Sequence, residues 1–183
     1  MERVRASIVL LALAAAPAGA PVTAATAPAT PRVPVTVAAL PALDGRIVAR
    51  IDAVRAAHGL SRLALAPGLV TAARLHSLQM ARSGLFRHES PDGTAFWKRI
   101  EHYYPAAGYR YWTVGENLLY ASPSIDAGDA LAQWIASPEH LANLKNKSWR
   151  DLGVSAVHVL HAGGVYGGQD VTIITTDFGA RHK

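Results

Sequence analysis

Three short segments of the chain place a histidine or a glutamate beside residues that turn or cap the backbone. The residues in question are His88, Glu116 and His140. Two imidazoles and one carboxylate, brought together, would form a small polar site able to hold zinc or another divalent cation, or to polarise a ligand. The chemistry open to this set is therefore metal binding, ligand binding or proton transfer.

Only tertiary folding could bring these three residues together, because no single helix or loop covers the sequence between them. The residues alone leave open the alternative that each one satisfies backbone groups at the end of an element. The chain has no His-Glu-x-x-His, no Gly-x-Ser-x-Gly, no P-loop and no cysteine, so the common local signatures of hydrolases and nucleotide-binding proteins are excluded.

The neighbouring residues predict how each segment is shaped. Gly115 permits a tight turn before Glu116. Ser137-Pro138 is typical of an N-cap followed by the first residue of a helix. The residues after His88, Ser90-Pro91-Asp92-Gly93, favour a turn. We therefore expect all three segments at the ends of elements.

Apolar spacing predicts helices over most of the chain that carries these segments. Ile47, Ile51 and Val54 recur at helical spacing and predict an amphipathic helix over 43–58. Pro67 opens a second helix that Gly84 closes, with His76 expected as a core histidine rather than a ligand. Further helices are expected at about 94–103 and 125–136, separated by a loop that contains Tyr109, Tyr111 and Trp112.

The last third of the chain changes to a strand-like period. Residues 154–160 and 171–178 are rich in β-branched and apolar residues, and Gly163-Gly164 between them indicates a hairpin turn. Helices followed by an antiparallel hairpin predict a layered α+β domain rather than an alternating βαβ fold.

The N-terminus has the pattern of a secretory signal peptide. A basic start is followed by an apolar run over 6–16 and then small residues, which predicts a signal peptide over 1–24. The apolar run is too short for a mature membrane-spanning helix, so we expect a secreted protein, extracellular or periplasmic. An uncleaved anchor is the alternative. Residues 25–41, mostly Ala, Pro, Thr and Val, predict an extended linker, which leaves 42–183 as one domain.

The composition narrows the range of partners. The chain carries a formal charge of +5 and a pI near 9.8, but its basic residues are scattered, whereas nucleic-acid readers concentrate them on one element. We therefore expect no nucleic-acid partner, and a soluble surface with some attraction to anionic envelope polymers. Without cysteine, the domain must be held by packing alone.

In their order along the chain, the motifs resemble those of the CAP superfamily (cysteine-rich secretory, antigen 5 and pathogenesis-related class 1 proteins; SCP domain), in its cysteine-free bacterial form. Residues 72–81 are similar to the family's Ala-x-x-His-Ser-x-x-Met-Ala, and 86–93 to its Phe-x-His-x-Ser-Pro-Asp-Gly. Residues 115–117 match its Gly-Glu-Asn, and 137–140 its Ser-Pro-x-His. The resemblance extends from about Leu43 to Phe178 and implies an α-β-α sandwich, with a small antiparallel sheet packed between helices.

The same resemblance implies a central cleft lined by two His and two Glu, in which the His pair binds zinc in some members. His88, Glu116 and His140 match three of these positions, so His88 and His140 are the expected metal ligands, with Glu116 as a third candidate. The second Glu would fall at Ser137, and Glu139 does not replace it because neighbouring helical residues point about 100° apart. One carboxylate fewer weakens any proton-transfer chemistry.

Two functions are the main expectations, and a third is weaker. The first is a secreted, non-enzymatic binding module whose cleft and aromatic rim take a small apolar ligand, an envelope component or a protein partner. The alternative is a metal-assisted, peptidase-like hydrolase with His88 and His140 as ligands and Glu116 as the base. A structural envelope protein, tethered by an uncleaved N-terminus, is a third hypothesis.

Overall fold

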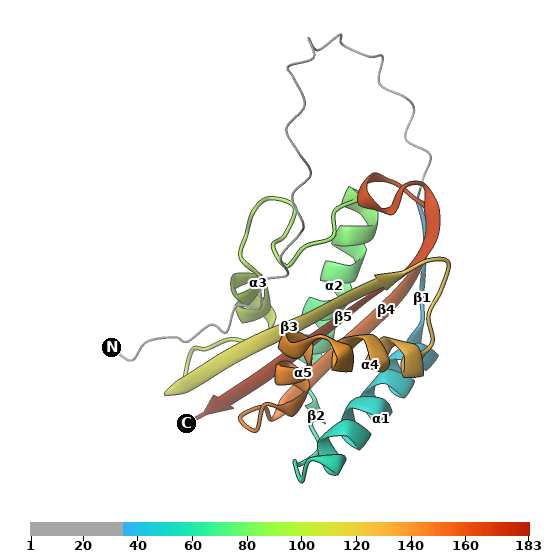
Figure 1. Cartoon of the computed structure of the whole chain (residues 1–183). Helices are drawn as coiled ribbons and strands as arrows, with labels where there is room; N and C mark the ends of the chain where they lie inside the picture. Colours follow the sequence, from blue (N-terminus) through green and yellow to red (C-terminus); the bar gives the residue numbers. More distant parts are fainter. Residues whose placement is uncertain (1–34) are drawn as a thin grey trace, which may run out of the picture.

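A five-stranded sheet between two layers of helices forms the framework of the protein (Figure 1). The computed structural model describes residues 35–183. The main path of the sheet runs β1-β4-β5-β3 with antiparallel pairing, and β2 pairs parallel with β4. The strands are β1 (Thr36–Ala39), β2 (Ala64–Leu65), β3 (Tyr111–Ala121), β4 (Asp151–Ala162) and β5 (Gln169–His182). The predicted α+β sandwich is confirmed.

The helices divide between the two faces of the sheet. They are α1 (Pro41–Ala57), α2 (Pro67–Ser83), α3 (Phe96–Tyr103), α4 (Ala127–Ala136) and α5 (Pro138–Lys145), with a short 3-10 turn, η1 (Gly164–Tyr166), between β4 and β5. Helices α1, α4 and α5 share one apolar core with the sheet, and α2 and α3 contribute to two others. This division lets the loop between α2 and α3 and the helix α5 approach β3 from different sides.

Local sequence explains why the two longest helices form and where they pack. Each starts with proline in its first turn, where the missing N–H costs nothing. Helix α2 ends at Gly84, whose φ of 68° lies in the left-handed region that glycine adopts without strain. Gly153 of β4 lets α2 approach closely, because a Cβ there would lie 2.1 Å from the backbone carbon of Leu69. Helix α2 therefore sits at a fixed depth on the sheet.

The segment around Glu116 differs most from expectation. The sequence predicted an aromatic loop and a tight turn at Gly115, but residues 111–121 form the continuous strand β3, paired with β5 along its whole length. Gly115 serves packing instead of turning, since a Cβ there would lie 2.9 Å from the ring of Trp149. The tight turn was therefore a wrong prediction.

The other elements differ from expectation mainly at their ends. Helix α3 begins at Phe96 and α4 at Ala127, each about two residues later than predicted. Helix α5 begins at Pro138 as the Ser137-Pro138 pair predicted, but the Ser137 side chain makes no capping hydrogen bond. The two predicted strands of the final hairpin are present in β4 and β5, and η1 takes the place of a simple turn.

The structure also bears on the N-terminal region. Residues 36–39, at the end of the predicted linker, form β1 and pair with β4, and α1 begins at Pro41. The folded part therefore includes residues before position 42. The predicted signal peptide and most of the linker lie outside the described residues. Within residues 35–183, no helix is both long and apolar enough to span a bilayer.

Candidate functional site

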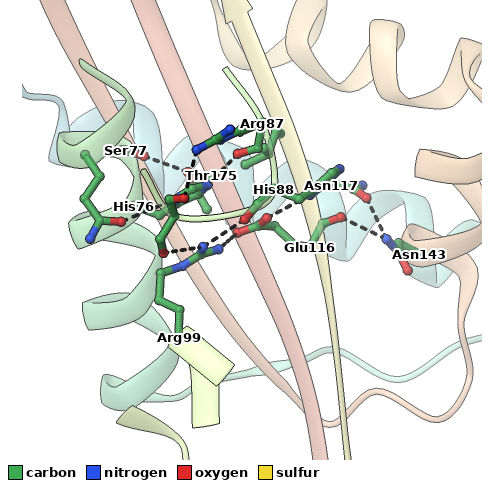
Figure 2. A network of polar contacts seen from close by, with 12 residues as sticks. His76, Ser77, Arg87, His88, Arg99, Glu116, Asn117, Asn143 and Thr175 are labelled. Atoms are coloured by element: carbon green, nitrogen blue, oxygen red, sulfur yellow. Dashed lines mark hydrogen bonds and ion pairs between the residues drawn. The ribbon is translucent and has the colours of Figure 1, made fainter. Parts of the chain in front are cut away.

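Glu116 lies at the centre of a buried polar network on the α2–α3 side of β3 (Figure 2). The residue is only 3% exposed. Its Oε1 accepts a hydrogen bond from His88 Nδ1 at 2.8 Å, and its Oε2 pairs with Arg99 Nη2. Both carboxylate oxygens are thus occupied by side chains from the segment between α2 and α3 and from α3 itself.

Arg99 ties the His88 segment to the sheet. Its Nη1 donates to the main-chain carbonyl of His88 at 2.9 Å and to Ser90 Oγ at 3.4 Å, while Nη2 holds Glu116. The arginine is buried on the same helix as Phe96 and Ile100, which pack into the core. The His88 side chain stays 23% exposed. The arrangement presents one imidazole at the surface and fixes its orientation from beneath.

Asp177 of β5 adds a second buried carboxyl group to this network. It stands opposite Glu116 in the pairing of β3 with β5, and both of its oxygens are buried without a hydrogen-bond donor among the described residues. Burial, reinforced by the negative charge of Glu116, raises the pKa of Asp177 well above its ordinary value, although Arg99 opposes this. Two buried carboxyl groups that face each other favour one proton between them, and the opposite pKa shifts assign that proton to Asp177.

Glu116 itself stays ionised. Burial alone would raise its pKa, but the charge of Arg99, assisted by His76 and His88, outweighs burial and lowers the pKa of Glu116. His76 on α2 is buried, and its Nε2 is 3.0 Å from the carbonyl of Arg87. It is a hydrogen-bonded core histidine, as the sequence predicted.

The other face of β3 carries a network of amides instead of charges. Asn117 Nδ2 donates to the main-chain carbonyl of His140 at 3.1 Å. Asn143, one turn later on α5, donates from Nδ2 to Asn117 Oδ1 at 2.8 Å and to the carbonyl of Glu116 at 3.2 Å. Two indoles extend this side, since Trp149 Nε1 donates to the carbonyl of Asn143 and Trp134 Nε1 to that of Leu118. Neutral hydrogen bonds therefore hold α5 against the sheet.

His140 reaches the site from this amide side. Partial burial lowers the pKa of its imidazole, and the nearby charge of His88 lowers it further, with Glu139 opposing. The ring is therefore neutral at pH 7 and can either donate or accept a hydrogen bond. Ser137 and Glu139, at the start of α5, are joined by a hydrogen bond of 3.2 Å between their exposed side chains.

The structure thus brings the three predicted residues together unequally. His88 and Glu116 are in direct contact, whereas His140 is linked to them through Asn117 and through its electrostatic interaction with His88. Sequence reasoning missed the roles of Arg99, Asp177 and Asn143. Two of them carried a signal: Arg99 lies on an apolar helical stripe, and Asp177 is a lone acid in a β-branched run. A charge in such a place needs a buried partner.

The residues present fit a resident zinc ion poorly. Among residues 35–183, no group of three or more His, Cys, Asp or Glu side chains is arranged to hold a metal ion. Glu116 is buried and paired with the cation of Arg99, so the accessible set offers at most the imidazoles of His88 and His140. Zinc sites in proteins use three or four protein ligands. We therefore derive no chemistry through a metal.

Comparisons with known proteins agree with the fold. The model of the CAP family, described as the cysteine-rich secretory protein family, matches residues 48–169. The chain therefore belongs to the CAP family. No curated protein matches the sequence.

Several solved structures are similar to this chain, and three of them illustrate the likeness. An extracellular protein of Bacillus anthracis that contains an SCP domain is 26% identical, with a TM-score of 0.58, and the match covers 78% of this chain and 41% of that one. An outer surface protein of Borrelia burgdorferi is 19% identical, with a TM-score of 0.56, over 74% and 90% of the two chains. A cysteine-rich secretory protein of Staphylococcus aureus is 17% identical, with a TM-score of 0.53, over 78% and 39%. This chain thus spans well under half of the first and third of these proteins.

Proposed function

We propose that this chain is an exported, non-enzymatic CAP-domain module that binds its ligand at the surface formed by His88 and His140. The extracellular and outer-surface locations named for similar structures support export. The ligand would be a small apolar molecule, an envelope component or a protein partner, with the two imidazoles supplying the polar contacts.

The hydrogen bonds and the burial of Glu116 are the observation that favours binding over catalysis. A general base needs a free lone pair within reach of the substrate and a pKa near the working pH. Each oxygen of Glu116 already accepts a hydrogen bond, from His88 or from Arg99, while burial keeps the residue out of reach of a substrate and its pKa is lowered. Glu116 is thus suited to fixing His88 in place, and the earlier hypothesis of Glu116 as a base loses its support.

One observation favours a second candidate. A carboxylate bound to Nδ1 of a partly exposed imidazole leaves Nε2 free to accept a proton, which is how hydrolases orient a histidine base. In that case His88 would activate water and Glu116 would orient it. His88 makes no hydrogen bond with a serine or threonine hydroxyl among the described residues, so the pair alone favours this candidate less than binding.

Turnover of a broad peptide and ester library, with and without added zinc, tests the proposal. We expect no activity above buffer for the wild-type protein. Activity that disappears in His88→Gln and Glu116→Gln, in variants that remain folded by circular dichroism, would overturn the binding proposal in favour of a hydrolase.

Mass spectrometry of molecules that co-purify with the protein is the second measurement. We expect a bound species in the wild-type protein that is reduced at least tenfold in His140→Ala. Arg74→Ala on the exposed side of α2 is a matched control that should leave the species in place. Equal retention in His140→Ala and the control would contradict a ligand site at the imidazoles.

A further inference from the structure

A second polar surface lies at one end of the sheet, where the start of β3, the end of β5 and the loop before β4 meet (Figure 1, lower left). The Arg110 N–H donates to the carbonyl of His182, and the Arg150 N–H to that of Gly179, both at 2.9 Å. These main-chain contacts bring the three segments together at one end of the sheet. We call it the basic sheet end and define it by Lys147, Arg150, Arg110, Arg181 and the ring pair Tyr111 and His182.

The positive charges of the basic sheet end are not matched by carboxylate side chains. In the segments 145–151, 110–111 and 181–183, Asp151 is the one acidic side chain. Its Oδ2 already accepts a hydrogen bond from the hydroxyl of Tyr104 at 2.5 Å. The surface therefore carries a local excess of positive charge, which attracts anions over a Debye length of about 8 Å at physiological salt.

Two arginines of this surface are fixed by neutral groups. The guanidinium carbon of Arg181 lies 4.0 Å from the ring centre of Tyr104 and 4.6 Å from that of Tyr109. Arg150 folds back on its own loop, where Nη1 donates to the carbonyls of Lys147 and Trp149 at 2.8 Å. Arginines held in this way lose little freedom when they bind an anion, and they keep N–H groups for it.

A pair of aromatic rings lies at the same end of the sheet, on the face opposite Arg181, because successive strand residues face opposite sides. Tyr111 is 43% exposed, and its ring stacks on the imidazole of His182 with centres 5.2 Å apart and planes 13° from parallel. An exposed, flat ring offers an apolar contact with a hydroxyl at its tip. Rings and guanidinium groups on the two faces of one sheet end suit a long polymer that alternates sugar rings with anionic groups and can reach both faces.

We propose that the basic sheet end binds a linear anionic glycopolymer of the cell envelope, whose repeating phosphate or carboxylate groups pair with Arg110, Arg150 and Arg181. This rests on the proposed function in one respect, namely that the protein is exported. The proposed binding surface is separate from His88 and His140. The partner that binds there is an anionic envelope polymer. The Arg fork matches phosphate and carboxylate alike.

Titration of the full chain with two polymers tests this proposal and separates the two anions. The probes are poly(glycerol phosphate) and polygalacturonate, followed by isothermal titration calorimetry at about 50 and about 200 mM salt. We expect binding at low salt that weakens as salt rises. Arg110→Glu with Arg150→Glu should weaken binding at least tenfold, because it replaces two attractive contacts with repulsive ones.

Matched variants decide between this surface and general charge attraction. Arg74→Glu with Arg82→Glu makes the same change in net charge on the exposed side of α2 and should alter affinity about twofold at most. His140→Ala should retain polymer binding even if the ligand proposed for the imidazoles is lost. If the double glutamate variant does not fold, the double variant Arg110→Ala with Arg150→Ala replaces it in the same titration.

Four results would overturn the proposal. They are an equal loss in both charge-reversal pairs, a loss in His140→Ala, no binding of either polymer at low salt, and tighter binding of a single-stranded oligonucleotide of equal charge. The last would identify a nucleic acid as the better partner.

Discussion

Glu116 and Asn117 are neighbours in β3, but they hold the two histidine segments by different kinds of interaction. On the α2–α3 side, Glu116 binds the His88 segment through an ion pair with Arg99 and a hydrogen bond to the ring. On the α5 side, Asn117 and Asn143 bind the His140 segment through neutral amide hydrogen bonds. Successive strand residues face opposite sides, so two adjacent residues place both imidazoles.

The two halves of the site should therefore respond differently to pH and to the loss of a partner residue. Buried charges depend on pH and on each partner being present, whereas buried amides depend only on their hydrogen bonds. The His88 half should therefore be sensitive to protonation and to loss of a partner. The amide contacts that hold α5 beside His140 should stay constant across the same range of pH.

Removing Arg99 should have the largest effect. Arg99→Met leaves Glu116 buried without its cation, and we expect a loss of about 3–5 kcal/mol in the free energy of unfolding at pH 7. Urea denaturation measures this loss. The double variant with Glu116→Gln should recover part of it, since no charge then stays unpaired. A loss below about 1 kcal/mol for Arg99→Met would contradict the ionic description of this half.

Removing the Asn143 amide should have an intermediate effect. Asn143→Ala leaves the Asn117 side chain and the carbonyl of Glu116 without their donor, which should cost about 2 kcal/mol. The same urea experiment at pH 5 and pH 8 should give an equal loss, because no titrating group is removed. A loss that changes with pH would break the distinction between the two halves.

Asp177→Asn should differ from the first two variants, because its effect is a change in how stability varies with pH and not a fixed loss. The raised pKa of Asp177 means that the folded protein keeps a proton that the unfolded chain releases near pH 4. Above that pH, its contribution to stability falls as pH rises, by at most about 1.4 kcal/mol per pH unit for one proton. The asparagine variant should lose less stability between pH 5 and pH 8. Identical slopes would show that Asp177 is ionised in the fold.

Elements with a clear apolar period were predictable from the sequence. Helix α1 follows from the spacing of Ile47 and Ile51, and α2 from its start at Pro67 and its end at Gly84. The sequence predicted these helices within a few residues, because burial of one apolar stripe decides such segments.

Strand β3 could not be predicted in the same way. Its central residues are Gly115, Glu116 and Asn117, which local preference assigns to turns. They form a strand because each polar group finds a buried partner on a different element, and local sequence does not encode those partners. For the same reason His88 and Glu116 could be singled out by type and motif, whereas Arg99 could be linked to them only in the folded structure.

The position of β3 at the edge of the sheet has a consequence for colloidal behaviour. An edge strand with free carbonyl groups is a template on which another chain can add a strand, and such pairing begins aggregation. In β3 the carbonyls of Glu116 and Leu118 are occupied by Asn143 and Trp134. Helices α4 and α5 therefore prevent another strand from pairing with this edge. A substitution that weakens the packing of α5 should promote aggregation and also displace His140.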